Sequence, residues 1–82
     1  MKKVSIYSTP TCTYCKMTKE FFGQNNVEFT DNDVSQDEAK RNEMVEKSGQ
    51  MGVPVIEIED KIIVGFDEQE LKKALKVGGK ND

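Results

Sequence analysis

Short segments of this chain carry the apolar spacing of strands and helices. Val4 to Tyr7 alternates apolar and polar residues, which is typical of a strand with one buried face. A helix is expected from Cys12 or Thr13 to about Gln24, where a glycine and two asparagines act as stop signals. Val27 to Asp31 is expected to form a second strand. The inner face of the helix should hold Met17, Thr18, Phe21 and Phe22.

Two capping boxes mark the starts of two further helices. In each box, an N-cap side chain and a glutamate three residues later satisfy each other's free backbone N–H groups. The first box runs from Ser35 to Glu38 and precedes a helix that should end at Gly49. The second box runs from Asp67 to Glu70. Its helix should present an inner face of Leu71, Ala74 and Leu75.

A hairpin separates these two helices. Val53 to Ile58 and Lys61 to Val64 are expected as antiparallel strands joined by a short turn at Glu59 and Asp60. The order is then β-α-β-α-β-β-α, in which a right-handed crossover makes the first two strands parallel. This order predicts a thioredoxin-like α/β fold with a four-stranded mixed sheet and helices on both faces. We expect one domain over residues 1–77 and a loose tail at 78–82.

The charge balance is mildly acidic, with 12 Lys and Arg against 15 Asp and Glu and a formal charge of −3. This balance gives no electrostatic footprint for nucleic acid or for an anionic membrane. No apolar run approaches the roughly 20 residues of a membrane span, so a cytoplasmic protein is expected. In a reducing compartment, two cysteines are more typical of catalysis or metal binding than of a structural disulfide.

The chain has no histidine, which excludes several mechanisms. No Ser-His-Asp triad, Cys-His dyad or histidine metal site can form within it. An activated cysteine must therefore depend on backbone dipoles or on a lysine or arginine. Lys16, which adjoins the second cysteine, is the best placed of these cations.

Cys12 and Cys15 have the spacing of a reactive dithiol. Residues three apart share one face of a helix, so the two sulfurs can reach disulfide distance. The predicted helix begins near Cys12, where free N–H groups and the helix dipole stabilise a thiolate. We expect Cys12 to be the nucleophile and Cys15 to resolve the mixed disulfide. Zinc is the rival interpretation, but the chain supplies two thiolates where a four-coordinate site needs four ligands.

Three segments resemble dithiol glutaredoxins, and the resemblance covers about residues 3–76. Tyr7 to Cys15 resembles the family's active-site region, whose usual motif is Cys-Pro-Tyr-Cys. Arg41 to Gly49, with Gly52 to Pro54, resembles the second helix and the Thr-Val-Pro loop. Gly65 to Glu68 resembles the Gly-Gly-x-Asp-Asp motif. Three motifs in the right order are far more specific than one.

The resemblance implies roles for residues around the two cysteines. It implies a cis peptide bond before Pro54, which would turn the Val53 backbone toward a peptide or glutathione for strand-like pairing. The alternative for Pro54 is an ordinary proline that opens a strand. Gly65 and Asp67 would hold the γ-glutamyl end of glutathione, and Asp67 would serve equally as a helix N-cap. Tyr14 would pack beside the bound thiol or remain an exposed side chain. The expected substrate-binding residues are Thr11, Thr13, Tyr14, Val53, Pro54, Gly65, Phe66, Asp67 and Glu68.

Five positions depart from the family pattern. Thr13 replaces the motif proline and restores an N–H donor near the first cysteine. Thr9 stands where many members carry a lysine for the glycine carboxylate of glutathione. Gly52, Val64 and Glu68 replace a threonine, a glycine and an aspartate in the other motifs. The disulfide chemistry is unaffected, but the last four changes weaken the case for glutathione.

The resemblance implies a thiol–disulfide oxidoreductase that reduces protein disulfides or glutathione mixed disulfides. Glutathione would be its co-substrate, and no metal or tightly bound cofactor is expected. The alternative is a redoxin reduced by thioredoxin reductase, for example one that donates electrons to ribonucleotide reductase. A third hypothesis is an iron–sulfur carrier in which two chains share a cluster through Cys12 and two glutathiones, which Tyr14 and Cys15 disfavour. Nothing in the first two hypotheses demands more than a monomer.

Overall fold

The computed structural model describes residues 3–75, which form four strands and three helices in the predicted order. Residues 76–82 lie outside the described part of the chain, and with them the predicted tail at 78–82. No helix within the described part is long and apolar enough to cross a membrane. The strands are β1 (Val4–Ser8), β2 (Thr30–Asp33), β3 (Val55–Ile58) and β4 (Lys61–Val64). The helices are α1 (Thr13–Gln24), α2 (Glu38–Ser48) and α3 (Glu68–Leu75).

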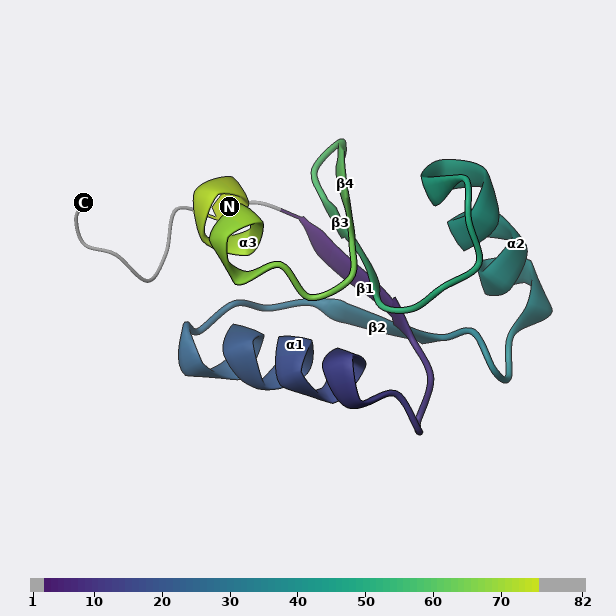
Figure 1. The fold of residues 1–82 in the computed structure, drawn as a ribbon, viewed down its shortest axis with the longest axis horizontal. Helices are drawn as coiled ribbons and strands as arrows, with labels where there is room; N and C mark the ends of the chain where they lie inside the picture. Colours follow the sequence, from purple (N-terminus) through teal and green to yellow (C-terminus); the bar gives the residue numbers. More distant parts are fainter. Residues whose placement is uncertain (1–2, 76–82) are drawn as a thin grey trace.

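The four strands form a mixed sheet in the order β2-β1-β3-β4, which confirms the predicted architecture (Figure 1). β1 and β2 are parallel, whereas β3 runs antiparallel to both β1 and β4. Tyr7 lies opposite Val55, and Val55 lies opposite Val64. The end of β1, the start of β3 and the end of β4 therefore lie at the same end of the sheet.

Helices cover both faces of the sheet, as predicted. Successive side chains of a strand point to opposite faces, so β1 and β3 each contribute to two apolar clusters. The larger cluster joins α1 and α3 to the sheet through Val4, Ile6, Phe21, Phe22, Ile56, Ile58, Ile63 and Leu71. The smaller cluster joins α2 to the other face through Tyr7, Val34, Met44 and Val55. β1, which leads directly into the cysteine segment, is therefore packed on both sides.

The second strand begins later than the predicted range of 27–31. β2 consists of the polar run Thr30–Asp33, whereas Val27 and Phe29 pack against the larger cluster from irregular backbone. The N–H of Val27 donates to the carbonyl of Phe22 at 2.9 Å and closes the end of α1. In this segment, the apolar residues contact the core without forming a strand. The strand forms farther along the chain, where the backbone lies beside β1.

Met17 is not on the inner face of α1, contrary to the prediction, and 40% of its surface is exposed. Successive helix residues are separated by about 100° around the axis. Met17 therefore falls just outside the buried stripe, although its neighbour Thr18 lies at the centre of that stripe. The buried residues of α1 are Cys15, Thr18, Phe21 and Phe22.

The first predicted capping box is also wrong. The N-cap of α2 is Asp37, whose carboxylate accepts the N–H of Lys40 at 3.1 Å. The hydroxyl of Ser35 instead donates to the carboxylate of Asp33 at 2.6 Å, in the turn that leaves β2. The turn thus uses the serine side chain, and the next acidic residue caps the helix. Gly49 ends α2 in the left-handed conformation, as predicted.

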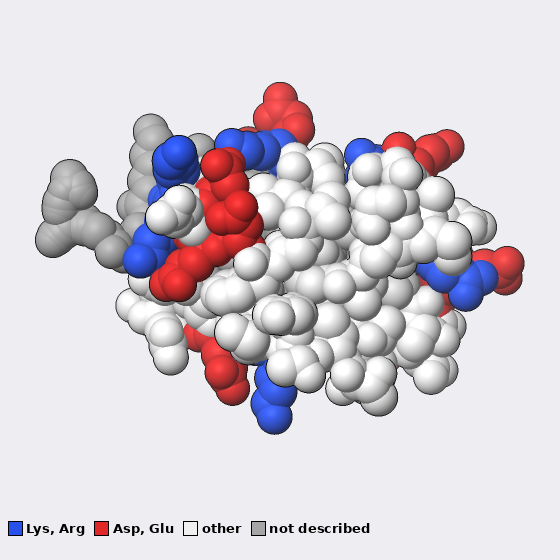
Figure 2. All heavy atoms as spheres, in the orientation of Figure 1, with Lys and Arg blue, Asp and Glu red and all other residues white. Residues whose placement is uncertain are grey.

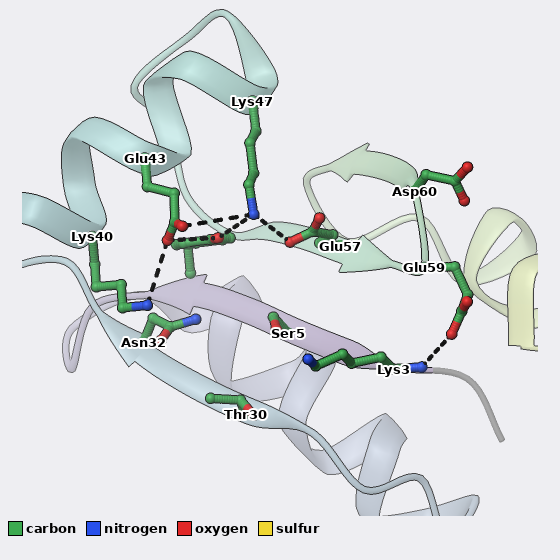
Figure 3. A pocket seen from close by; sticks show the side chains of 11 residues that line it. Lys3, Ser5, Thr30, Asn32, Lys40, Glu43, Lys47, Glu57, Glu59 and Asp60 are labelled. Atoms are coloured by element: carbon green, nitrogen blue, oxygen red, sulfur yellow. Dashed lines mark hydrogen bonds and ion pairs between the residues drawn. The ribbon is translucent and has the colours of Figure 1, made fainter.

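A polar network fastens α2 to the sheet (Figure 3). The hydroxyl of Tyr7, a residue that is 1% exposed, donates to Glu43 at 3.1 Å and accepts from Lys47 at 3.3 Å. Lys47 also donates to Glu57 of β3 at 2.8 Å. Burial raises the pKa of Tyr7, and the hydrogen bond to Glu57 raises the pKa of Lys47. Both groups are therefore protonated at neutral pH, and one lysine links α2 to β1 and β3.

Tyr7→Phe should lower the free energy of unfolding by about 1 kcal/mol, because it removes a hydroxyl from this network and keeps the ring in the core. Urea unfolding at neutral pH measures the change. The control is Tyr14→Phe, because Tyr14 is 60% exposed and should contribute much less to stability. Equal effects of the two substitutions would show that the Tyr7 hydroxyl does not stabilise the fold.

Candidate active site

Three segments that the sequence singled out leave the sheet at the same end. Ser8 ends β1 and leads to Cys12, and Val53-Pro54 leads into β3. Gly65 follows β4, and its N–H donates to the carbonyl of Pro54 at 2.8 Å. The strand register and this hydrogen bond bring together motifs that are far apart in the sequence.

Cys12 and Cys15 form a disulfide, with their Cα atoms 5.2 Å apart. Cys12 is the N-cap of α1, and its sulfur accepts the N–H of Cys15 at 3.1 Å. Cys12 is half-buried, whereas Cys15 is 1% exposed. A disulfide that arrives from solvent therefore meets the sulfur of Cys12 first. This geometry supports the unequal roles predicted for the two cysteines.

The start of α1 is placed to stabilise a thiolate at Cys12. The N-cap position gives the sulfur a hydrogen bond from an amide and the positive end of the helix dipole. No acidic side chain lies in the first turn of α1 to oppose a thiolate. The side chain of Lys16 is exposed and forms no ion pair within residues 3–75. The helix backbone is therefore the nearest group that can stabilise a thiolate here, and the exposed Lys16 lies in the same first turn of α1.

The Val53–Pro54 peptide bond is cis, as the resemblance implied. β3 begins at Val55 and not at the predicted Val53, because proline has no N–H to donate to the sheet. Val53 is half-buried, and its N–H and C=O groups form no hydrogen bond with other described residues. Val53 therefore presents one free donor and one free acceptor, which are the groups that strand-like pairing with a substrate requires.

The loop after β4 is held by glycine conformation and by the core. Gly65 has a φ of 82°, in the left-handed region that favours glycine. The ring of Phe66 packs edge-on against Phe21, with their centroids 6.2 Å apart. Phe66, which was expected to contact substrate, thus supports the loop from the core side.

Asp67 is exposed and caps α3, because its carboxylate accepts the N–H of Glu70 at 3.2 Å. The second half of the predicted capping box is not formed, because the carboxylate of Glu70 pairs with Lys61 at 3.1 Å. Glu68 is also exposed and pairs with Lys72 at 3.4 Å. Of these acidic residues, Asp67 lies nearest in sequence to the Gly65 loop.

Sequence reasoning missed one side chain of this site, that of Gln50. Its Oε1 accepts the N–H of Gly52 at 2.6 Å, and its Nε2 donates to the carbonyl of Gly52 at 3.0 Å. The only signal in the sequence was the glycine itself, which stands where the family carries a threonine. Gln50 therefore shapes the backbone directly before Val53.

Over most of their length, the three segments at this end of the sheet carry no charged side chain. The sequence has no Lys, Arg, Asp or Glu over residues 8–15, 48–56 and 62–66. Figure 2 accordingly shows a broad uncharged area over the start of α1 and the segment that precedes β3. Thr11 and Thr13 are exposed within this area, and the large exposed apolar side chains include Tyr14, Met51 and Val64. Backbone groups and apolar side chains are therefore what these segments offer to a ligand.

A separate open cavity of about 670 Å³ lies between α2 and the sheet (Figure 3). Its lining includes Tyr7, Glu43, Lys47 and Glu57, the members of the α2 network, and neither cysteine. Within residues 3–75, no group of three or more Cys, Asp and Glu side chains is arranged to hold a metal ion. The cysteine end of the sheet is thus the candidate active site.

Comparison with known proteins gives consistent matches. The glutaredoxin family model matches residues 4–63. An uncharacterized glutaredoxin-like 8.6 kDa protein in the rubredoxin operon of Clostridium pasteurianum is 48% identical over 73 residues, which cover 89% of this chain and 97% of that protein. The glutaredoxin-like protein NrdH of Lactococcus lactis is 37% identical over 73 residues, which cover 85% and 96%. The crystal structure of the glutaredoxin (grx-1) from Archaeoglobus fulgidus has a TM-score of 0.85 at 28% identity, over 93% of this chain and 88% of that one.

The family-model match runs from the strand before Cys12 to the hairpin after Pro54, so it includes the two cysteines and the Val53–Pro54 segment. The relatives are matched over nearly their whole length, and the solved structure has the same fold. The chain therefore belongs to the glutaredoxin family and is a thiol–disulfide oxidoreductase with Cys12 and Cys15 as its redox pair.

Proposed function

We propose that this glutaredoxin reduces protein disulfides and glutathione mixed disulfides through a dithiol cycle in which glutathione is the electron donor. The observation that carries the proposal is the placement of Cys12. Its half-buried sulfur caps α1 at the same end of the sheet as the free backbone groups of Val53. Val53 would hold an extended substrate by strand-like pairing while Cys12 exchanges with its disulfide.

The cycle begins when the Cys12 thiolate attacks one sulfur of the substrate disulfide. A Cys12–substrate disulfide forms, and the other substrate sulfur leaves as a thiolate that takes a proton from water. Cys15 then gives up its proton and attacks the sulfur of Cys12, which releases the second substrate thiol. The substrate gains two electrons and two protons, and the protein is left with the Cys12–Cys15 disulfide. Two glutathione molecules return the electrons and become glutathione disulfide.

The burial of Cys15 suits it to the second step. Cys15 is 1% exposed, so its thiol does not compete for substrate in solvent, yet its sulfur is within bonding reach of the Cys12 sulfur that it must attack. The amide of Cys15 already contacts that sulfur. Resolution therefore needs no large movement of the helix.

Asp67 supports glutathione as the donor. One oxygen of its carboxylate caps α3, and the exposed carboxylate remains available to the ammonium group of a γ-glutamyl moiety. The free N–H groups at the start of α3 suit the neighbouring carboxylate of that moiety. The N–H of Gly65, two residues before Asp67, donates to the Pro54 carbonyl and so joins the loop before α3 to the Val53–Pro54 segment.

A second candidate donor is thioredoxin reductase, which reduces some glutaredoxin-like redoxins. The specific observation in its favour is the uncharged surface, because Thr9 and its neighbours over residues 8–15 offer no cation to the glycine carboxylate of glutathione. Segments without charged side chains that expose Tyr14 and Met51 form the kind of surface that contacts another protein.

Cys12→Ser should abolish disulfide reduction, whereas Cys15→Ser should retain the first attack and accumulate a mixed disulfide, because only the resolving thiol is lost. Mass spectrometry of each reduced variant after mixing with glutathione disulfide measures the adduct. The adduct of one glutathione is expected on Cys15→Ser alone. Full activity of Cys12→Ser in insulin reduction would contradict the assignment of the nucleophile.

If glutathione is the donor, a mixture of glutathione, NADPH and glutathione reductase should sustain insulin reduction by this protein. Asp67→Asn should then raise the KM for glutathione about fivefold, because one charged contact is lost. Asp60→Asn, an exposed carboxylate on the β3–β4 turn, is the control and should leave the KM unchanged. Turnover with NADPH and thioredoxin reductase, but not with glutathione, would replace the first candidate donor by the second.

A further inference from the structure

The segment between α2 and β3 is folded around the side chain of Gln50. Its amide forms a pair of hydrogen bonds with the N–H and the C=O of Gly52, at 2.6 and 3.0 Å. A backbone N–H can donate only to Oε1 and a carbonyl can accept only from Nε2, so this pairing fixes the orientation of the amide. Both groups of one residue are satisfied, as they are when a residue pairs with a neighbouring strand.

The Gln50 amide is itself held in place by the end of α2. Its Nε2 also lies 3.3 Å from the hydroxyl oxygen of Ser48. That hydroxyl donates its one proton toward two carbonyl oxygens, that of Met44 at 2.7 Å and that of Gln50 at 3.0 Å. Because Met44 is 1% exposed and belongs to the core, the amide is connected to a rigid part of the helix. The backbone of Gly52 is therefore positioned by α2.

Gly52 and Gln50 depend on each other. A Cβ atom at position 52 would lie 2.8 Å from Oε1 of Gln50, which is closer than real Cβ contacts allow. A threonine at this position, which the family pattern carries, is incompatible with this placement of the amide. Any residue with a Cβ at position 52 would therefore require the Gln50 amide to move away from the backbone that it pairs with.

The paired groups of Gly52 leave Val53 as the next residue with a free donor and acceptor. We propose that Gln50 is a positioning residue for protein disulfide substrates: it fixes Gly52 so that the Val53 backbone is held ready for pairing with an extended peptide. The inference rests on the proposed function, because it concerns how that site receives its substrate. A small disulfide that makes no backbone pairing gains nothing from this arrangement.

The test uses pre-reduced protein in single-turnover reactions, so the identity of the electron donor does not enter. Gln50→Ala should slow the reaction with insulin about tenfold, the scale of losing one or two hydrogen bonds, and leave the reaction with dithiodipyridine within twofold of the wild type. Gln24→Ala, an exposed glutamine at the end of α1, is the matched control and should change neither rate.

A double-mutant cycle separates the contact from a general loss of structure. Gly52→Ala should slow insulin reduction in the wild type, where the new Cβ meets Gln50, and should cost little in Gln50→Ala. Amide hydrogen exchange gives a readout besides activity, because the N–H of Gly52 should be protected in the wild type and exchange faster in Gln50→Ala.

Equal slowing of both substrates in Gln50→Ala would overturn the proposal, because the residue would then act on the cysteines or on the fold. Unchanged insulin reduction in that variant would overturn it as well. Failure of the wild type to reduce insulin, with normal reaction toward dithiodipyridine, would instead reject the proposed function together with this role of Gln50. Additive effects in the double-mutant cycle would show that Gln50 and Gly52 act independently and would overturn the proposal too.

Discussion

The antiparallel pairing of β1 with β3 is the constraint on which the active site depends. The pairing of Tyr7 with Val55 places the start of β3 next to the end of β1, and β4 follows β3 in register. Three segments that are distant in the sequence thereby leave the sheet together, one with Cys12, one with Val53 and one with Gly65. A shift of this pairing by one residue would move the β1 side chains to opposite faces and separate the loop from the cysteines. The two apolar clusters on β1 prevent such a shift.

Prediction from the sequence succeeded where a short-range pattern is compatible with only one local structure. The β-α-β-α-β-β-α order, the helix that begins beside Cys12 and the glycine that ends α2 all follow from short-range patterns. The prediction placed β2 too early in the chain because Val27 and Phe29, although apolar, pack against the core from outside the strand. Asp37 caps α2 in place of the predicted Ser35 because both side chains can accept a capping hydrogen bond, and the hydroxyl of Ser35 is used in the turn with Asp33.

The candidate site likewise combines features that sequence patterns predict with features that only the folded chain determines. The spacing of Cys12 and Cys15 and the resemblance around Pro54 were sufficient to predict which segments meet. The pairing of Gln50 with Gly52 was not predictable in that way, because a glutamine side chain adopts many rotamers and only the folded loop selects one. Likewise, the network of Tyr7 and Lys47 joins residues that are forty positions apart, and no local pattern marks it.

The hydrogen bond from the Cys15 amide to the sulfur of Cys12 makes one atom part of both the fold and the chemistry. The reactive sulfur occupies the place that a serine or aspartate oxygen fills in an ordinary helix. A negatively charged sulfur accepts that hydrogen bond more strongly than a disulfide sulfur does. Reduction of the protein therefore strengthens the cap of α1, and oxidation weakens it. Any interaction that stabilises the start of α1 more strongly in the thiolate form than in the disulfide form also favours reduction of the protein, by thermodynamic linkage. The stability of the helix and the reduction potential are therefore coupled through the sulfur of Cys12.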